Sequence, residues 1–304
     1  MSGLDDYLAQ HRERFQGELC DLLRIPSISA SSAHRQDVRR AAEWVADQFR
    51  GLKLSTEVVE TPGHPIVYAE SPGVPGAPTA LVYGHYDVQP PDPLKEWISP
   101  PFEPTIRDGN LYARGATDDK GQMFTHIKSA EAWIKSQGKL PLRLKFLIEG
   151  EEEVGSVHLD EFIAQNRARL ACDCVVISDT SQFAPGQPAI TYGLRGLAYF
   201  ELNLTGPSQD KHSGTFGGAV VNPANVLCSM LSALVNDRGQ VQIPNFYDDV
   251  EPLTPRERDE FKKLPFNERD FMQQLEVEAL GGEEGYSTLE RRWARPTFDI
   301  NGML

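Results

Sequence analysis

A histidine and a carboxylate stand two positions apart where an apolar stretch of the chain ends. The run Leu81-Val82-Tyr83 stops at a glycine, and His85 and Asp87 follow it. In an extended chain such side chains point to the same side, so the carboxylate can orient and polarise the imidazole. By itself the pattern is a weak indication of a metal site, because any strand end can carry polar residues.

Three acidic positions elsewhere could complete such a site. The segment RGATDDKGQ, residues 114 to 122, either caps a helix through its aspartates or makes Asp118 a ligand that bridges two cations. The segment EGEEEVGS, residues 149 to 156, follows an apolar run. Its glutamates either form a solvated face at a helix start or divide metal binding from proton transfer. Asp179 ends a third apolar run, VVIS.

Together these positions offer one imidazole nitrogen and three carboxylates, without a thiolate. This set of ligands suits Zn²⁺, with Mn²⁺ and Co²⁺ as alternatives. Two cations that share one aspartate would lie roughly 3.5–4 Å apart and would activate a water molecule for hydrolysis. The residues therefore indicate a metal-dependent hydrolase.

The apolar spacing predicts the elements that must position these residues. Strands alternate with helices, which predicts an α/β sheet covered by helices on both faces. In such sheets, ligands bind beyond the strand ends. The expected helices are 4–24, 38–51, 121–136 and 158–170; the expected strands are 55–60, 66–71, 79–84, 142–150 and 172–180, with a hairpin about Asp108-Gly109.

The sequence changes character near residue 194, which predicts two domains, 1–193 and 194–304. Residues 196–206, GLAYFELNLTG, alternate as a half-exposed antiparallel strand does, and residues 222–237 have the pattern of a helix. A short helix is expected after Thr254. The second domain is therefore expected to be α+β.

Composition excludes several classes of protein. The formal net charge of −14 argues against a nucleic-acid partner, because a polyanion would be repelled. No apolar run approaches the roughly 20 residues that span a bilayer, and the first ten residues do not resemble a signal peptide. The four cysteines form no C-x-x-C pair. A soluble cytoplasmic protein is expected.

Several segments, in the same order along the whole chain, resemble the dinuclear zinc peptidase family of carnosine dipeptidases, aminoacylases and glutamate carboxypeptidases. The segments are GHYDVQP, PPFEP, DGNLYARGATDDKG, EGEEEVGS, ISD, TYGLRG, DKHSGTFGG and RPTFDINGM. The DVQP, HSGTFGG and NFYDDV segments are most similar to the cytosolic dipeptidase branch. The resemblance implies a catalytic sheet domain and a second domain that serves as lid and dimerisation domain.

The resemblance also implies a metal-binding role for four residues. His85 and Asp179 would hold one zinc ion, Glu153 would hold the second, and Asp118 would bridge both. The peptide bond between Asp118 and Asp119 would be cis.

Three further residues would act beside the metals. Glu152 would be the general base and Asp87 would orient His85. His212 resembles the lid histidine that reaches the active site of a partner subunit and stabilises the oxyanion, so a homodimer is implied.

The implied function is that of a dipeptidase-type metallopeptidase, which hydrolyses dipeptides or short peptides with metal-activated water. In the family the last zinc ligand is a histidine beyond the lid. Leu304, the last residue of this sequence, is expected to lie inside the lid. Two alternatives remain: an N-acyl-amino-acid amidohydrolase, and a truncated remnant that keeps the fold without turnover.

Overall fold

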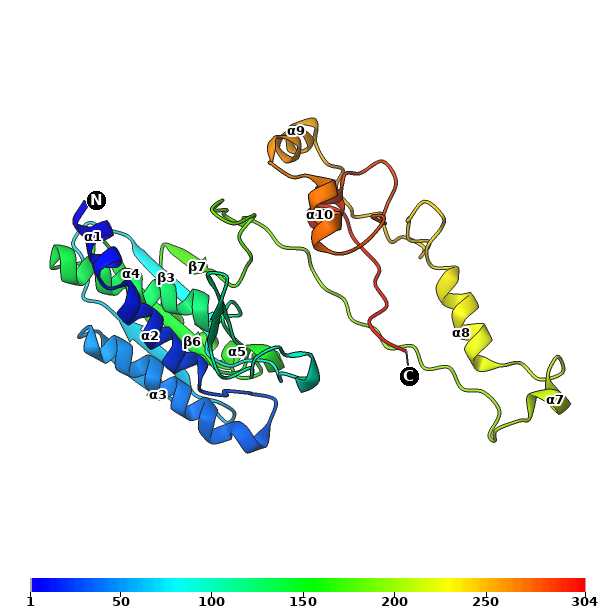
Figure 1. Ribbon diagram of the computed structural model, residues 1–304, viewed down its shortest axis with the longest axis horizontal. Coiled ribbons are helices and arrows are strands. Elements are labelled where there is room, and N and C mark those ends of the chain that lie inside the picture. The colour runs from blue at the N-terminus through cyan, green and yellow to red at the C-terminus, as the bar shows by residue number, and fades with distance from the viewer. Residues whose placement is uncertain (1, 304) are drawn as a thin grey trace. The chain divides into compact units, whose positions relative to one another are not determined.

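The computed structural model describes residues 2–303 and separates into two compact units at the bond between Pro188 and Ala189 (Figure 1). The division lies close to the boundary expected between residues 193 and 194. Among the described residues, every helix is too short or too polar to cross a membrane.

The first unit contains the sheet and most of the helices. The helix expected at 4–24 is two helices, which are separated at His11. The helices are α1 (Ser2–Gln10), α2 (Arg12–Leu23), α3 (Arg35–Gly51), α4 (Lys120–Gln137), α5 (Leu159–Gln165) and α6 (Arg167–Leu170), with short 3₁₀ turns η1 (Ser32–His34), η2 (Leu94–Glu96) and η3 (Glu152–Val154). The strands are β1 (Ser55–Val59), β2 (Ile66–Glu70), β3 (Thr79–His85), β4 (Thr105–Arg107), β5 (Asn110–Tyr112), β6 (Arg143–Glu149) and β7 (Cys174–Ile177).

Five strands form one mixed sheet in the order β1-β2-β6-β3-β7. Strand β3 lies between β6 and β7 and runs parallel to both, whereas β2 is antiparallel to β1 and β6. The carboxyl ends of β3, β6 and β7 therefore meet at the same edge. Strands β4 and β5 form the expected hairpin, whose turn at Asp108 and Gly109 has positive φ at both residues.

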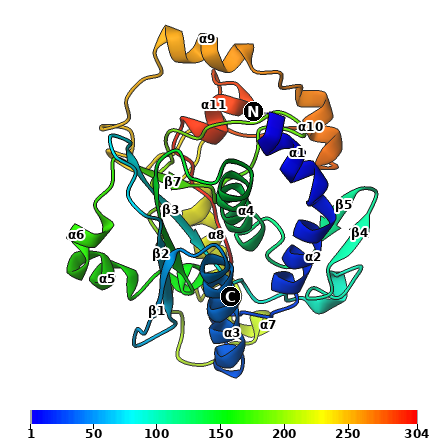
Figure 2. The same ribbon diagram turned by 90° about the vertical axis from the view of Figure 1, so that its left-hand side faces the viewer.

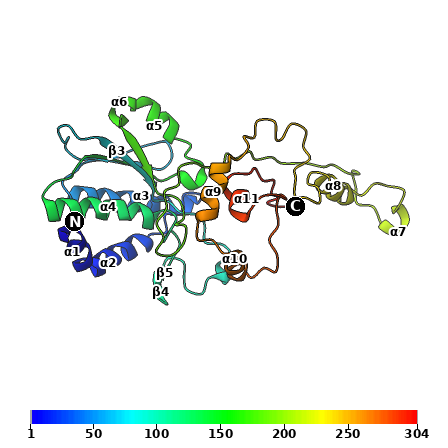
Figure 3. The same ribbon diagram turned by 90° about the horizontal axis from the view of Figure 1, so that it is seen from above.

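Helices cover both faces of the sheet, as predicted. Figures 2 and 3 show α5 and α6 on one side, α3 and α4 on the other, and α1 and α2 outside α4. Alternate residues of each strand enter the two cores, because side chains of a strand point to opposite faces. One core joins the sheet to α3 and α4 through Val67, Val82, Phe146, Val45, Phe49 and Ile127; the other joins it to α5 and α6 through Tyr68, Leu81, Leu147, Phe162 and Leu170.

The second unit consists of short helices joined by long irregular segments. Its helices are α7 (Ser213–Phe216), α8 (Pro223–Ser232), α9 (Pro255–Lys263), α10 (Glu268–Gln274) and α11 (Thr288–Trp293). Thr254 caps α9 in a reciprocal pair with Glu257, which confirms the helix expected there.

The strand expected at residues 196–206 was a wrong prediction. Residues 196–206 form no strand, and Leu197 and Phe200 are 91% and 86% exposed. Alternation favours a strand only where a neighbouring strand accepts its hydrogen bonds, and the described part of this unit contains only an isolated bridge between Val235 and Val241.

Candidate metal centre

His85 is the last residue of β3 and is completely buried. Its Nδ1 lies 3.2 Å from the main-chain oxygen of Asp87, to which it can donate a hydrogen bond. The Asp87 carboxylate Oδ1 lies 3.3 Å from the same nitrogen, outside hydrogen-bond geometry. This contact fixes the ring so that Nε2 faces the strand-end edge.

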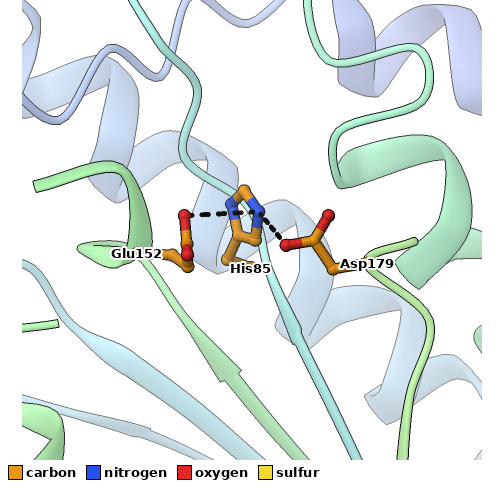
Figure 4. Close-up of side chains that lie close together, drawn as sticks. All are labelled: His85, Glu152 and Asp179. Carbon is orange, nitrogen blue, oxygen red and sulfur yellow. Dashed lines mark ion pairs between the residues drawn. The ribbon is translucent and has the colours of Figure 1, made fainter. Parts of the chain in front are cut away.

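Three carboxylates face this Nε2 atom from three different chain segments. Oδ1 of Asp118 lies 3.2 Å away, Oδ2 of Asp179 lies 3.7 Å away, and Oε2 of Glu152 lies 3.9 Å away. Figure 4 shows His85 between Glu152, which follows β6, and Asp179, which follows β7. His85, Glu152 and Asp179 come together because the carboxyl ends of three parallel strands share one edge, and Asp118 reaches this edge from the turn before α4.

The donor atoms form two overlapping groups, each with its ligand atoms within 4.8 Å of one another. One group contains His85, Glu152 and Asp179, and the other contains His85, Asp118 and Glu153. The buried Nε2 atom has no hydrogen-bond partner in the structure. A buried polar atom without a partner is costly, and a cation among these oxygens would satisfy it. The residues present therefore fit a divalent metal ion.

The electrostatics of the site also favour positive charge. Burial lowers the pKa of His85, but the Asp87 carboxylate and the neighbouring carboxylates of Asp119 and Glu152 outweigh it and raise the pKa to about 10. Burial and repulsion among the carboxylates raise the pKa of Glu152 and of Glu153. A bound cation would relieve this repulsion.

Asp118 and Asp119 point in different directions although they are adjacent. The peptide bond between them is cis, which confirms that prediction. The Asp118 side chain is 60% exposed and faces the imidazole, whereas Asp119 is buried and its Oδ2 accepts a hydrogen bond of 3.1 Å from the His85 main-chain N–H. Burial raises the pKa of Asp119 to about 7. Asp119 precedes α4, yet its side chain makes no cap hydrogen bond.

The glycine that interrupts the apolar run before His85 has a steric reason. A Cβ atom at Gly84 would come within 2.7 Å of Oδ2 of Asp119. The close approach lets Asp119 reach the main chain of His85 and hold the end of β3. The sequence does not identify Asp119 as a supporting residue, because a doubled aspartate before a helix is equally typical of a cap.

Two glutamates of the acidic segment point away from the metal centre. Glu149 accepts hydrogen bonds from the hydroxyl groups of Tyr83 and Ser156. Glu151 accepts one of 3.1 Å from the His64 main-chain N–H and pairs with His158 at 2.7 Å. Glu153, in contrast, is held in the site by Gln89, whose side-chain amide donates to Oε2 at 2.8 Å. The spacing of these glutamates in the sequence does not show which of them face the metal centre.

His212 lies in the second unit, at the N-cap of α7. Its Nδ1 accepts a hydrogen bond of 3.0 Å from the Gly214 main-chain N–H, and the residue is exposed. His212 thus lies in the second unit. The other predicted site residues come together in the first unit: His85, Asp87, Asp118, Glu152, Glu153 and Asp179.

Comparisons with known proteins identify the family of the chain. Residues 81–296 match the sequence profile described as Peptidase family M20/M25/M40. The Cys-Gly metallodipeptidase of Schizosaccharomyces pombe is 33% identical over 313 residues, which cover 99% of this chain and 66% of that protein. The human Beta-Ala-His dipeptidase is 34% identical over 312 residues, 98% of this chain and 62% of that protein.

The crystal structure of human carnosine dipeptidase 1 has the same fold. It superimposes with a TM-score of 0.85 at 33% sequence identity, over 99% of this chain and 68% of that chain. This chain thus spans less than two thirds of the length of the two curated relatives above.

Proposed function

The chain belongs to Peptidase family M20/M25/M40, and from this we propose that it is a metal-dependent hydrolase that cleaves the amide bond of dipeptides or short peptides. One observation carries the proposal: the buried, unpartnered Nε2 of His85 faces carboxylates from three segments at the carboxyl edge of the sheet. The similar proteins named above are a Cys-Gly dipeptidase and a Beta-Ala-His dipeptidase, which supports a dipeptide as substrate.

We assign the ligands to two divalent ions, Zn²⁺ first, with Mn²⁺ and Co²⁺ as alternatives. His85 and Asp179 would hold one ion, Glu153 would hold the other, and Asp118 would bridge them. The distance of 3.2 Å between His85 Nε2 and Asp118 Oδ1 supports an ion shared by these two residues, and a donor atom of Glu153 lies within 4.8 Å of both. When bound, the ions polarise the substrate carbonyl and lower the pKa of water.

Glu152 is the proposed general base. Its carboxylate lies at the edge of the cluster with a side chain that is 36% exposed, so it can reach both water and a substrate. It takes a proton from the attacking water and returns it to the leaving amine. Asp87 keeps the His85 imidazole oriented, mainly through its main-chain oxygen.

His212 is proposed to act in a homodimer, in which it would donate a hydrogen bond to the oxyanion in a partner's site. Its exposure leaves Nε2 free to do so. On this proposal residues 1–193 form the catalytic domain and residues 194–304 the lid and dimerisation domain. All four cysteines are free thiols, which supports a reducing cytoplasmic location.

The test is hydrolysis by the chain after loading with Zn²⁺, Mn²⁺ or Co²⁺. Release of free amino acids from Cys-Gly or β-Ala-His, abolished by a chelator and restored by metal, would support the proposal. Preferential hydrolysis of N-acetyl amino acids would instead indicate an amidohydrolase. Absence of metal binding in equilibrium dialysis would refute the proposed site.

A further inference from the structure

We propose that Glu149 is a positioning residue, whose buried carboxylate fixes the turn that carries Glu152 and Glu153 relative to His85. The inference rests on the proposed function, because it concerns the placement of the proposed base and of a proposed metal ligand. It gives a role to an acidic residue that takes no part in either group of metal-binding atoms.

Glu149 is the last residue of β6 and lies opposite His85 in the parallel register of β3 and β6. Its side chain is buried. Oε1 accepts two hydrogen bonds, one of 2.6 Å from the Tyr83 hydroxyl and one of 2.8 Å from the Ser156 hydroxyl. Tyr83 precedes His85 by two positions on β3, so one carboxylate oxygen links the strand of His85 to the far end of the acidic turn.

The turn between Glu149 and Ser156 is closed at its base by this bond. Inside the turn, the Gly155 main-chain N–H donates a hydrogen bond of 2.9 Å to the main-chain oxygen of Glu152. The Glu153 main-chain N–H donates to Oδ2 of Asp87 at 3.2 Å, across to the segment after β3. Because the turn is short and tied at its base, a shift of Ser156 would move both Glu152 and Glu153.

The residue type at position 156 supports this role. Ser156 has φ of 52°, in the left-handed region, which costs a residue with a Cβ atom roughly 1–2 kcal/mol. Its neighbour Gly155, at φ of 92°, is the residue that such a backbone favours. The hydroxyl bond to Glu149 accounts for a serine at a position whose backbone suits glycine.

The four glutamates of the segment therefore have two separate tasks. Glu149 and Glu151 are anchors, because their carboxylates accept hydrogen bonds from Tyr83, Ser156 and the His64 main chain. Glu152 and Glu153 face the imidazole and the other carboxylates.

The test is titration of the purified chain with Co²⁺, followed by visible absorption, on Tyr83→Phe and Ser156→Gly. Loss of a supporting hydrogen bond behind a metal ligand typically costs about 10–100-fold in metal affinity. We expect about tenfold weaker Co²⁺ binding and an altered absorption spectrum in both variants. Glu149→Gln keeps an oxygen that can accept both bonds, and should retain most of the affinity.

Tyr68→Phe is the matched control. It removes another tyrosine–glutamate hydrogen bond, 3.0 Å from Tyr68 to Glu70, at the opposite end of the same sheet. This variant should lose thermal stability without a change in Co²⁺ affinity. If Tyr83→Phe does not fold, Ser156→Gly decides, because glycine suits the positive φ of this position and the substitution removes only the small hydroxymethyl group.

Wild-type Co²⁺ affinity in Ser156→Gly, or equal losses in the Tyr68 and Tyr83 variants, would overturn the positioning role and leave the proposed function intact. Failure of the wild-type chain to bind Co²⁺ would overturn the proposed function and this inference together.

Discussion

The Nε2 atom of His85 lies 3.2 Å from Oδ1 of Asp118, yet it is buried and forms no hydrogen bond in the structure. Leaving a buried polar atom unsatisfied costs roughly 1–3 kcal/mol. The opposite Nδ1 atom is committed to the main-chain oxygen of Asp87, so the ring cannot turn without losing that bond. The imidazole is thus held with its Nε2 atom directed at a cluster of negative charge.

Replacement of His85 by glutamine should therefore weaken Zn²⁺ binding strongly. Removing a hydrogen-bond partner behind a metal ligand typically lowers metal affinity by roughly 10–100-fold. The loss of Zn²⁺ affinity in His85→Gln should be larger, because the ligand itself is removed. Competition with a chromophoric chelator measures it. The matched control is His34→Gln, which removes an imidazole paired with Asp37 at 2.8 Å on α3. Equal Zn²⁺ affinity in wild type and His85→Gln would exclude His85 as a ligand.

Glu152→Gln and Glu153→Gln should separate proton transfer from metal binding. Removing a general base typically lowers the rate by about 10²–10⁴-fold, so Glu152→Gln should lose turnover while it retains its metal. Glu153→Gln removes a charged ligand and should lose metal content first. Metal analysis after dialysis, beside dipeptide hydrolysis, measures both. Because Glu152 also lies within 4.8 Å of the donor atoms of His85 and Asp179, equal metal loss in both variants would make Glu152 a ligand.

The sequence predicted the first unit well because its signals are local. Each apolar run of β3, β6 and β7 ends at the residue type that the site needs, and parallel pairing then brings the strand ends together. The segment containing Asp118 was harder to interpret, because an aspartate before a helix is equally typical of a cap. The structure argues against the cap, because the side chain of the neighbouring Asp119 makes no cap hydrogen bond.

The features that were not predicted depend on contacts between residues distant in sequence. Glu149 differs from Glu152 only in what surrounds it, namely the hydroxyl groups of Tyr83 and Ser156. The strand expected at residues 196–206 failed for a related reason: alternation describes a strand's two faces but does not supply the neighbouring strand that must bond to it.

A dimer that shares its active sites should be detectable by complementation. His212→Ala removes the proposed oxyanion donor and should lower turnover by about 10²–10³-fold, with metal content unchanged. A mixture of this variant with Glu152→Gln should recover part of the activity, since one site in each mixed dimer has both residues intact. Subunit exchange is verified by mass, and no recovery after exchange would refute action across subunits.

The last prediction concerns the buried charge cluster that joins α1 and α2 to α4. Glu131 on α4 accepts hydrogen bonds from Tyr7 at 3.0 Å, from Lys128 at 2.9 Å and from Arg14. Burial raises the pKa of Glu131, but the bonds from Arg14 and Lys128 outweigh it and lower the pKa to about 2. Because this pKa lies below the ordinary value of 4.5, the folded chain favours the ionised form.

The stability that Glu131 contributes is therefore fully present above about pH 4.5 and is lost as the pH falls toward 2. Glu131→Gln should lower the free energy of unfolding at pH 7 by about 2 kcal/mol, the usual scale for hydrogen bonds to a charged group. The difference between wild type and variant should shrink between pH 5 and pH 2 in urea denaturation. Glu57→Gln, at an exposed pair with Arg169, should change little at any pH. A difference that stays constant over this range would show that Glu131 contributes through packing rather than charge.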